Sequence, residues 1–258
     1  MPAPDRLDPD KITANLQTSR IGRRALVFAS TSSTNDLAAE YARDKANHGL
    51  VIFAEAQTAG RGRADNKWLD QPYHSILCSV LLTQCTVRHE LLSLTAAVAV
   101  AQAIAHNAKI KWPNDILINA KKVAGILLES KPCPYGRASI IGIGINCHQQ
   151  QDSFPPELRE LATSIDIETR TFCDRISLAR RLLTCLDQWI DLAHTDKNLL
   201  INCWRSLSTQ LGHRLTVLYD QRRFTGRCIG IDPEKGLILR LDSDSVTFFP
   251  AAHSTIIQ

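Results

Sequence analysis

The sequence lacks the cysteine pattern of a structural zinc site. Its eight cysteines include no Cys-x2-Cys pair, and the one histidine at ligand spacing is His148, beside Cys147. Most of these cysteines lie in apolar runs, where a free thiol packs as a small hydrophobic group in a reducing compartment. We therefore expect no metal ion bound by protein side chains alone, and a cytoplasmic location.

Long apolar segments and a large excess of charge are also missing. The most apolar helix candidate, residues 91–105, contains Ser93, Thr95 and Gln102 and is shorter than the roughly 20 residues that cross a bilayer. No signal segment opens the chain. Thirty basic and 26 acidic residues leave a net charge of +4, too little to indicate bulk nucleic-acid binding. We expect neither a membrane nor a nucleic acid as a partner.

What the sequence does contain is typical of a globular protein with a large and a small folding unit. It has 258 residues, 44% of them apolar and 22% charged, enough for a full hydrophobic core. Periodicity predicts a body that mixes strands and helices, followed by a β-rich tail. We predict an arm at residues 1–21, a main domain at 22–210 and a small domain at 211–258.

The expected elements can be placed along the chain. In the body, strands are predicted at residues 25–29, 51–57, 75–82, 109–112, 116–118, 123–128 and 140–145, and helices after residue 35 and at 91–105, 174–194 and 197–206. In the tail, strands are predicted at 215–219, 222–231, 236–241 and 246–249, separated by turn residues. The tail is small enough to need packing against the body for stability.

Residues 60–63 read Gly-Arg-Gly-Arg. The glycines leave the backbone N–H groups bare, and the arginines are always cationic, so the string suits the wrapping of an anion. It is neither a Walker A loop nor a dinucleotide fingerprint, because the third small residue of the latter is replaced by Asp65. On its own the string also fits a mobile basic surface loop.

Two further strands carry unusual patterns. In residues 140–145, alternation puts Ile141, Ile143 and Ile145 on one face, and Gly142, Gly144 and then Asn146 on the other. Bare backbone on that face indicates close approach of either a ligand or a packed helix, and both readings stay open. In residues 109–112, Lys109 and Lys111 share a face while Trp112 packs on the other, before Pro113 stops the strand.

These strings, in this order, resemble the biotin protein ligases, in their monofunctional form without an N-terminal DNA-binding domain. The resemblance runs from about Ile21 to the C-terminus and is carried by Ser33-Thr-Asn, Glu55-Ala-Gln-Thr-Ala-Gly-Arg-Gly-Arg with Trp68 following, Lys111-Trp-Pro-Asn-Asp, Lys122-Val-Ala-Gly-Ile-Leu-Leu-Glu and Gly142-Ile-Gly-Ile-Asn. It implies an α+β fold: a catalytic domain similar to class II aminoacyl-tRNA synthetases, with a mixed sheet and helices, then a small SH3-like β barrel.

The resemblance also implies a reaction. Biotin and ATP would form biotinyl-5'-AMP with Mg²⁺, and biotin would then pass to a lysine of a biotin carboxyl carrier protein domain. By this resemblance the biotin-binding residues are Ser33, Thr34, Asn35, Gln57, Gly60, Arg61, Gly62, Arg63, Lys111, Gly142 and Gly144. The ATP-binding residues are Arg63, Lys67, Trp68, Asn114, Asp115 and Asn146, and the catalytic residues are Lys111, Arg63 and Arg61.

The residue types suit this chemistry. The ureido ring of biotin offers one carbonyl acceptor and two N–H donors, which buried hydroxyls and amides such as Ser33, Thr34, Asn35 and Gln57 can read without net charge. The Ser33-Thr-Asn string equally fits a helix N-cap. Attack of a carboxylate on the α-phosphate brings two anions together, so a cation such as Lys111 is expected between them.

One departure from the family pattern affects the loop. Family members commonly have Gly-Arg where this chain has Asp65-Asn66, so the loop gains an acid and misses a cation. Lys67 is the candidate to replace that cation.

Three rival interpretations are weighed against this one. A lipoate or octanoate ligase of the same superfamily would not need the polar ring readers. A DNA-binding repressor would need a further N-terminal domain, for which the 21-residue arm leaves no room. A non-catalytic biotin-binding protein is opposed by the presence of Lys111 and Arg63. The sequence leaves open whether the chain forms a homodimer through its sheet edge.

Overall fold

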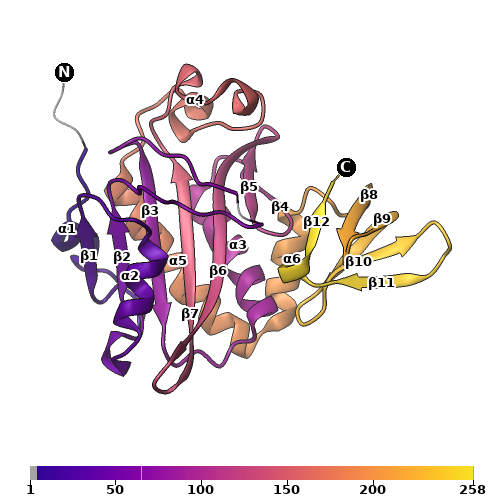
Figure 1. The fold of residues 1–258 in the computed structure, drawn as a ribbon, viewed down its shortest axis with the longest axis horizontal. Coiled ribbons are helices and arrows are strands. Elements are labelled where there is room, and N and C mark those ends of the chain that lie inside the picture. The colour runs from indigo at the N-terminus through magenta and orange to yellow at the C-terminus, as the bar shows by residue number, and fades with distance from the viewer. Residues whose placement is uncertain (1–4, 65, 258) are drawn as a thin grey trace.

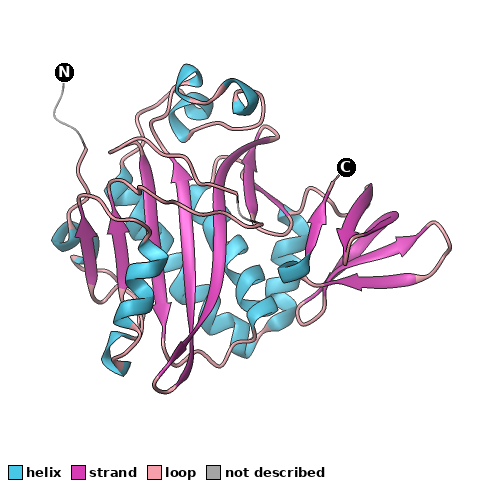
Figure 2. Ribbon diagram, viewed as in Figure 1, coloured by secondary structure: helices cyan, strands magenta, loops and turns pink. Residues whose placement is uncertain are grey.

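A computed structural model describes residues 5–64 and 66–257. The chain forms a large mixed sheet with helices on both faces, and a small antiparallel sheet lies beside it (Figures 1 and 2). This arrangement confirms the predicted α+β class. The residue at which the two parts divide stays a prediction, because positions 210 and 211 lie between the last helix of the first part and the first strand of the second.

The large sheet has seven strands in the order β1-β2-β3-β7-β6-β5-β4. β1 and β2 pair in parallel, and the remaining neighbours are antiparallel. The strands are β1 (Ala25–Phe28), β2 (Val51–Ala54), β3 (Ser75–Leu82), β4 (Lys109–Lys111), β5 (Asp115–Ile118), β6 (Lys121–Cys133) and β7 (Gly136–Asn146). β2 ends earlier than predicted, and β6 and β7 continue as a long hairpin beyond the predicted ends.

Helices on the two faces of this sheet differ in character. α3 (His89–Ile104) is apolar on all sides, and it is buried against α5 (Arg175–Thr195) and the sheet. The opposite face carries α2 (Thr34–Tyr41), which packs on β3 and β7 through a separate small core that includes Ala38 and Ile140. In the described part of the chain, no helix has the length and apolarity to cross a membrane.

The alternation predicted for residues 140–145 is confirmed. Ile141, Ile143 and Ile145 belong to the core under α3 and α5. Gly142 and Gly144 therefore face the side of the sheet that carries α2. A Cβ at Gly142 would lie 2.5 Å from Oδ1 of Asn35, so the helix does approach the bare backbone closely. Both glycines also line a cavity on this face.

The N-terminal arm is bound to the body. It contains α1 (Pro9–Thr13), which Asp8 caps by accepting hydrogen bonds from two backbone N–H groups. Farther on, the carboxylate of Asp187 in α5 accepts the backbone N–H groups of Ser19, Arg20 and Ile21. The carboxylate of Glu55 binds the N–H of Leu7 at 2.6 Å, so the arm is fixed to the end of β2.

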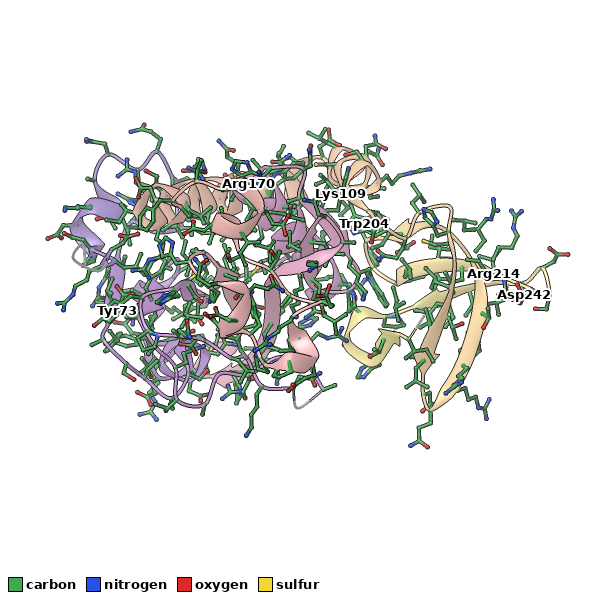
Figure 3. The ribbon with its side chains drawn as sticks, turned by 90° about the horizontal axis from the view of Figure 1, so that it is seen from above. Tyr73, Lys109, Arg170, Trp204, Arg214 and Asp242 are labelled. Carbon is green, nitrogen blue, oxygen red and sulfur yellow. The ribbon has the colours of Figure 1, made fainter. Side chains whose placement is uncertain are left out.

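The small sheet has the strand order β11-β10-β9-β8-β12. Its strands are β8 (Arg214–Tyr219), β9 (Arg222–Asp232), β10 (Gly236–Leu241), β11 (Val246–Phe249) and β12 (Ser254–Ile256), and all but β12 were predicted. Its contact with the body involves α6 (Lys197–Leu207) and β9. Figure 3 labels the buried Trp204 of α6 at this junction, and the Arg214–Asp242 pair toward the far side of the sheet.

Short helices complete the chain. They are η1 (Lys45–Asn47), η2 (Gln151–Ser153), η3 (Pro156–Leu158), α4 (Ile165–Thr169) and η4 (Ala251–His253). η2, η3 and α4 lie in the long segment between β7 and α5, above one end of the large sheet (Figure 1). This segment was predicted to turn helical after Pro155.

Candidate functional site

A cavity of about 230 Å³ lies on the α2 face of the large sheet. Its walls come from the start of α2, the Gly-Arg loop, the β4–β5 corner, the middle of β6 and β7, and β12 of the small sheet. The predicted residues that line it are Ser33, Thr34, Asn35, Gln57, Arg61, Gly62, Arg63, Lys67, Trp68, Lys111, Asn114, Asp115, Gly142 and Gly144. Thus strings that are far apart in the sequence meet in one place.

One end of the cavity is polar and uncharged. Ser33, Thr34 and Asn35 are each less than 5% exposed, at the N-terminus of α2. Gln57 Oε1 accepts the backbone N–H of Thr34 at 2.8 Å. Ser33 is the N-cap residue of α2 by position, but its side chain makes no capping hydrogen bond. Ser33 therefore does not cap α2 with its side chain, and the capping interpretation of the string is wrong for this residue.

Asn35 is held on both sides of its amide. Oδ1 lies 2.6 Å from Oγ of Ser79, and Nδ2 donates to Oε2 of Glu129 at 2.6 Å. A flipped amide would set its oxygen against the carboxylate, so this orientation is the consistent one. Burial raises the pKa of Glu129, but hydrogen bonds from Asn35 and Lys131, together with nearby positive charge, outweigh it and lower the pKa. Both polar atoms of the Asn35 amide are thus used in contacts within the protein, so this side chain holds its neighbours in place instead of offering a free polar atom to a ligand.

The Gly-Arg loop is folded as a small hairpin over the cavity. Gly62 N donates to Asn66 O at 2.6 Å, and Trp68 N donates to Gly60 O at 3.0 Å. Arg61 and Lys67 face each other in an antiparallel bridge. Asn66 closes the turn through its side chain, which donates to the carbonyl of Arg63. Asp65, the predicted departure from the family pattern, lies outside the described residues.

Arg61 fastens the start of this loop to the body. Its guanidinium makes two hydrogen bonds of 2.7 Å with Asp36 of α2 and lies 3.3 Å from Oε2 of Glu129. The hydrogen bond from Arg61 lowers the pKa of Asp36, and the same contact raises the pKa of the arginine. Because two carboxylates already surround it, Arg61 is suited to anchoring the loop.

Arg63 reaches toward the small sheet. Its Nη2 donates to the carbonyls of Ala251 and Ser254, the latter at 3.1 Å, and its Nη1 lies 3.4 Å from Oδ1 of Asn114. Burial lowers the pKa of the guanidinium. These carbonyls are neutral, and the carboxylates of Asp115 and Glu90 act on the charge only at longer range, so the position favours an incoming anion. The small sheet therefore takes part in shaping the site.

Trp68 lies across bare backbone on β6 and β7. A Cβ on Gly144 would meet its ring at 2.5 Å, and one on the paired Gly125 would meet it at 2.9 Å. These glycines let an indole ring lie flat on the sheet. Its Nε1 is buried and has no hydrogen-bond partner within residues 5–64 and 66–257. A buried donor of this kind is available to a ligand.

A lysine that the sequence interpretation did not select occupies a central position. Lys122 lies at the start of β6, 2.6 Å from Oδ1 of Asp115, with its ammonium 5.6 Å from the centre of the Trp68 ring. It is only partly exposed. Lys111 also lines the cavity, but it is exposed on the short strand β4, whose buried residue is Ile110. The shared face of Lys109 and Lys111 is confirmed.

A second cavity of about 290 Å³ adjoins the first. Asn66, Lys67, Trp68 and Lys122 line both cavities. Its apolar walls come mainly from the segment after β7: Phe154, Pro155, Leu158, Leu161 and Ala162. Residues 69–71, before β3, and the polar Gln149 and Ser153 complete the lining. Asn146, predicted to bind ATP, lines this cavity, and its amide donates to Thr163 O at 2.9 Å.

The structure thus gathers most of the predicted residues and adds others. Gly60 is buried behind the loop, with Trp68 O and the Gln57 amide on its side-chain side. The added residues are Asp36, Ser79, Lys122 and Glu129, with the Ala251 and Ser254 carbonyls. Lys122 and Glu129 are the first and last residues of the string Lys122-Val-Ala-Gly-Ile-Leu-Leu-Glu, so the sequence did contain a signal for these two. Nothing in the local sequence marks Ser79. In the described part of the chain, no three His, Cys, Asp or Glu side chains are grouped to hold a metal ion.

Comparison with known proteins shows which family has this sequence and fold. The model of the Biotin/lipoate A/B protein ligase family matches residues 27–146. The bifunctional ligase/repressor BirA of Bacillus spizizenii is 36% identical over 247 residues, which cover 92% of this chain and 75% of that protein. The biotin–[acetyl-CoA-carboxylase] ligase of Mycobacterium tuberculosis is 33% identical over 229 residues, 83% of each chain.

A solved structure agrees with the fold. The biotin protein ligase from Aquifex aeolicus, in complex with biotin and ATP, superposes with a TM-score of 0.79 at 24% identity and covers 91% of this chain and 98% of that one. The identities of the relatives over most of the sequence assign the chain to the Biotin/lipoate A/B protein ligase family and, within it, to the biotin protein ligases.

Proposed function

We propose that this protein is a biotin–[acetyl-CoA-carboxylase] ligase, which activates biotin with ATP and transfers it to a lysine of a carrier protein. The observation that carries the proposal is the division of one continuous site. An uncharged, hydrogen-bonded end lies under α2, and a cationic region around Lys122 separates it from an apolar second cavity. This sequence of environments matches a ureido ring, a carboxylate beside a phosphate, and an adenine.

The uncharged end would hold the ureido ring. Gln57 uses its Oε1 on the backbone N–H of Thr34, so its Nε2 is the atom left to donate to a carbonyl. Ser33, whose side chain makes no capping hydrogen bond, lines the same cavity. A buried neutral site of this kind discriminates strongly against acids that lack the ring, since its polar groups would be left unpaired.

Lys122 would serve the activation step. A carboxylate oxygen of biotin attacks the α-phosphorus of ATP, the bond from that phosphorus to the bridging oxygen breaks, and pyrophosphate leaves. Lys122 lines both cavities, where an ammonium offsets the charge of the two anions as they approach. Asp115 holds it in place at 2.6 Å. Lys111, the residue predicted for this role, lies exposed at the rim, where it suits the outer phosphates.

The second cavity would hold the adenine, with Trp68 and the apolar side chains of Leu158 and Leu161 as walls and Asn146 as a polar edge. Mg²⁺ is part of the same proposal. Asp115 and Asn114 supply a carboxylate and an amide oxygen at the cavity wall, and this donor set fits an ion held mainly by phosphates and water. When bound, the ion would neutralise charge on the phosphates.

In the second half-reaction, the amine of a carrier lysine attacks the carbonyl carbon of biotinyl-AMP, the acyl–phosphate bond breaks, and AMP leaves. The residues at the cavity supply no side chain that we assign as the general base. We propose the carboxyl carrier domain of a carboxylase as the partner and the cytoplasm as the location, in keeping with the eight free cysteines. Nucleic acid is not part of this proposal, and dimerisation through a sheet edge is left to experiment.

The test is ATP–pyrophosphate exchange with biotin, lipoate and octanoate supplied separately. We expect exchange with biotin, and transfer of label to a carrier domain but not to a carrier whose target lysine is replaced by arginine. Exchange that is faster with lipoate or octanoate would contradict the assignment of the ring-reading end. Biotin binding without any exchange would contradict the proposed activity.

A further inference from the structure

We infer that Ser79, a residue of β3 with no assigned role, fixes the direction of the Thr34 hydroxyl and so sets which atoms of a ring the cavity can read. Ser79 is 0% exposed, and its hydroxyl lies between the side chains of Thr34 and Asn35, which line the cavity. It is a positioning residue, because it acts through these two neighbours.

The inference follows from a count of hydrogen atoms. Ser79 Oγ lies 2.7 Å from Oγ1 of Thr34 and 2.6 Å from Oδ1 of Asn35. An amide oxygen carries no hydrogen, so the single hydroxyl hydrogen of Ser79 must go to Asn35. The hydrogen in the other contact must then come from Thr34.

The alternative arrangement is unfavourable. Thr34 Oγ1 also lies 3.2 Å from Oε1 of Gln57. If the threonine donated there, the 2.7 Å contact with Ser79 would hold two oxygens and no hydrogen. Gln57 Oε1 already accepts the backbone N–H of Thr34 at 2.8 Å, so it is not left unpaired when the threonine hydroxyl donates to Ser79. In the consistent chain of hydrogen bonds, Thr34 therefore donates to Ser79, Ser79 donates to Asn35, and Asn35 donates to Glu129.

This direction gives the cavity a fixed polarity. With its hydrogen committed to Ser79, the Thr34 hydroxyl presents lone pairs to the cavity and can only accept. Gln57, whose Oε1 faces the backbone N–H of Thr34, presents Nε2 to the cavity as a donor. An acceptor beside a donor suits a ligand ring with an N–H next to a carbonyl. Without Ser79, the threonine hydroxyl keeps only the longer 3.2 Å contact with Gln57 Oε1. It can then turn to donate into the cavity, so the polarity is no longer fixed.

The experiment rests on the proposed function, since it uses biotin as the probe. Binding of biotin is measured by calorimetry without ATP and compared with binding of the two cyclic carbamate analogues, in which one ring N–H is replaced by oxygen. In the wild type, we expect at least one analogue to bind about 100-fold more weakly, because an oxygen would face the Thr34 lone pairs. In Ser79→Ala, the turned hydroxyl accommodates that oxygen, and the ratio should fall to about tenfold or less.

Controls separate this role from a structural one. Thr95→Val removes an equally buried hydroxyl, which bonds only the Leu91 carbonyl of its own helix, and should leave the ratio as in the wild type. Ser79→Thr keeps a hydroxyl and should preserve the ratio, whereas the weaker donor in Ser79→Cys should give an intermediate value and serves if the alanine variant does not fold.

Equal weakening of biotin and of both analogues in the Ser79 variants, with an unchanged ratio, would overturn the inference and leave the proposed function intact. Failure of the wild type to bind biotin would overturn both.

Discussion

The two ends of the cavity are built differently. Under α2, buried and neutral side chains hold one another by hydrogen bonds: Thr34 to Gln57 and Ser79, and Ser79 to Asn35. Around the Gly-Arg loop, the side chains are charged and partly exposed, and three of the cations have a partner: Arg61 with Asp36, Arg63 with backbone carbonyls, and Lys122 with Asp115.

On the proposed function, the difference follows from what each end would do. A neutral ring is read best by groups fixed beforehand on a helix and a strand, because no charge has to be moved when it binds. Phosphates and a carboxylate are bound by exchanging ion pairs, so their ligands lie on a loop and at strand ends, where contacts can be remade. Recognition and activation can therefore be impaired separately.

The largest effect is expected at the activation end. Lys122→Met should lower the rate of biotin-dependent ATP–pyrophosphate exchange by about 10²–10³-fold, because the carboxylate and the α-phosphate would meet without a cation between them. Lys111→Met is the matched variant, since that lysine lines the same cavity but is exposed. It should lose about tenfold or less. A greater loss in Lys111→Met would return the central role to the residue predicted from sequence.

A smaller and more selective effect is expected at the two glycines of β7. A Cβ at Gly142 would press on Asn35, and one at Gly144 would press on Trp68, each at 2.5 Å. Gly142→Ala should raise the KM for biotin about tenfold, and Gly144→Ala should raise the KM for ATP by a similar factor. Steady-state kinetics with each substrate varied in turn would check this. Parallel changes in both constants for both variants would argue against separate ends.

The smallest effect concerns the anchor of the loop. Asp36→Asn should destabilise the protein by about 0.2–1 kcal/mol at neutral pH, since the pair with Arg61 is partly exposed. Because the folded-state pKa of Asp36 is lowered, its contribution is present above the unfolded value of about 3.9 and is lost as the pH falls through the folded value. Melting temperatures of both proteins from neutral to acidic pH should therefore converge below about pH 4. A difference that grows at low pH would contradict this sign.

Much of the fold could be predicted because the strong patterns are local. The apolar helix α3 and the alternating strand β7 carry their burial in their own composition. β12 was missed because its three residues, Ser254–Ile256, hold too little pattern, and it is defined only by pairing with β8. The extension of β6 and β7 was missed for a similar reason, since their outer halves pair mainly with each other.

The site was predicted less completely, because contacts between distant elements decide which residues line the cavity. Lys111 and Lys122 both stand in quoted strings, and the sequence does not say which of them is held inside the cavity by a carboxylate. The tight β5–β6 turn at Asn119 and Ala120, both with positive φ, returns Lys122 to Asp115, whereas Lys111 stays at the rim. Ser79 has no local signal at all: it matters only because β3 lies beneath the start of α2.

The measurement that tests this account most directly is the exchange reaction of Thr34→Val and Lys122→Met, with biotin varied to saturation. Thr34→Val should raise the KM for biotin by about 30-fold or more while kcat stays within about tenfold of wild type. Lys122→Met should lower kcat by about 100-fold or more even at saturating biotin and ATP. If Thr34→Val lowers kcat as much as Lys122→Met does, recognition and activation are not separate functions of the two ends, and the account is wrong.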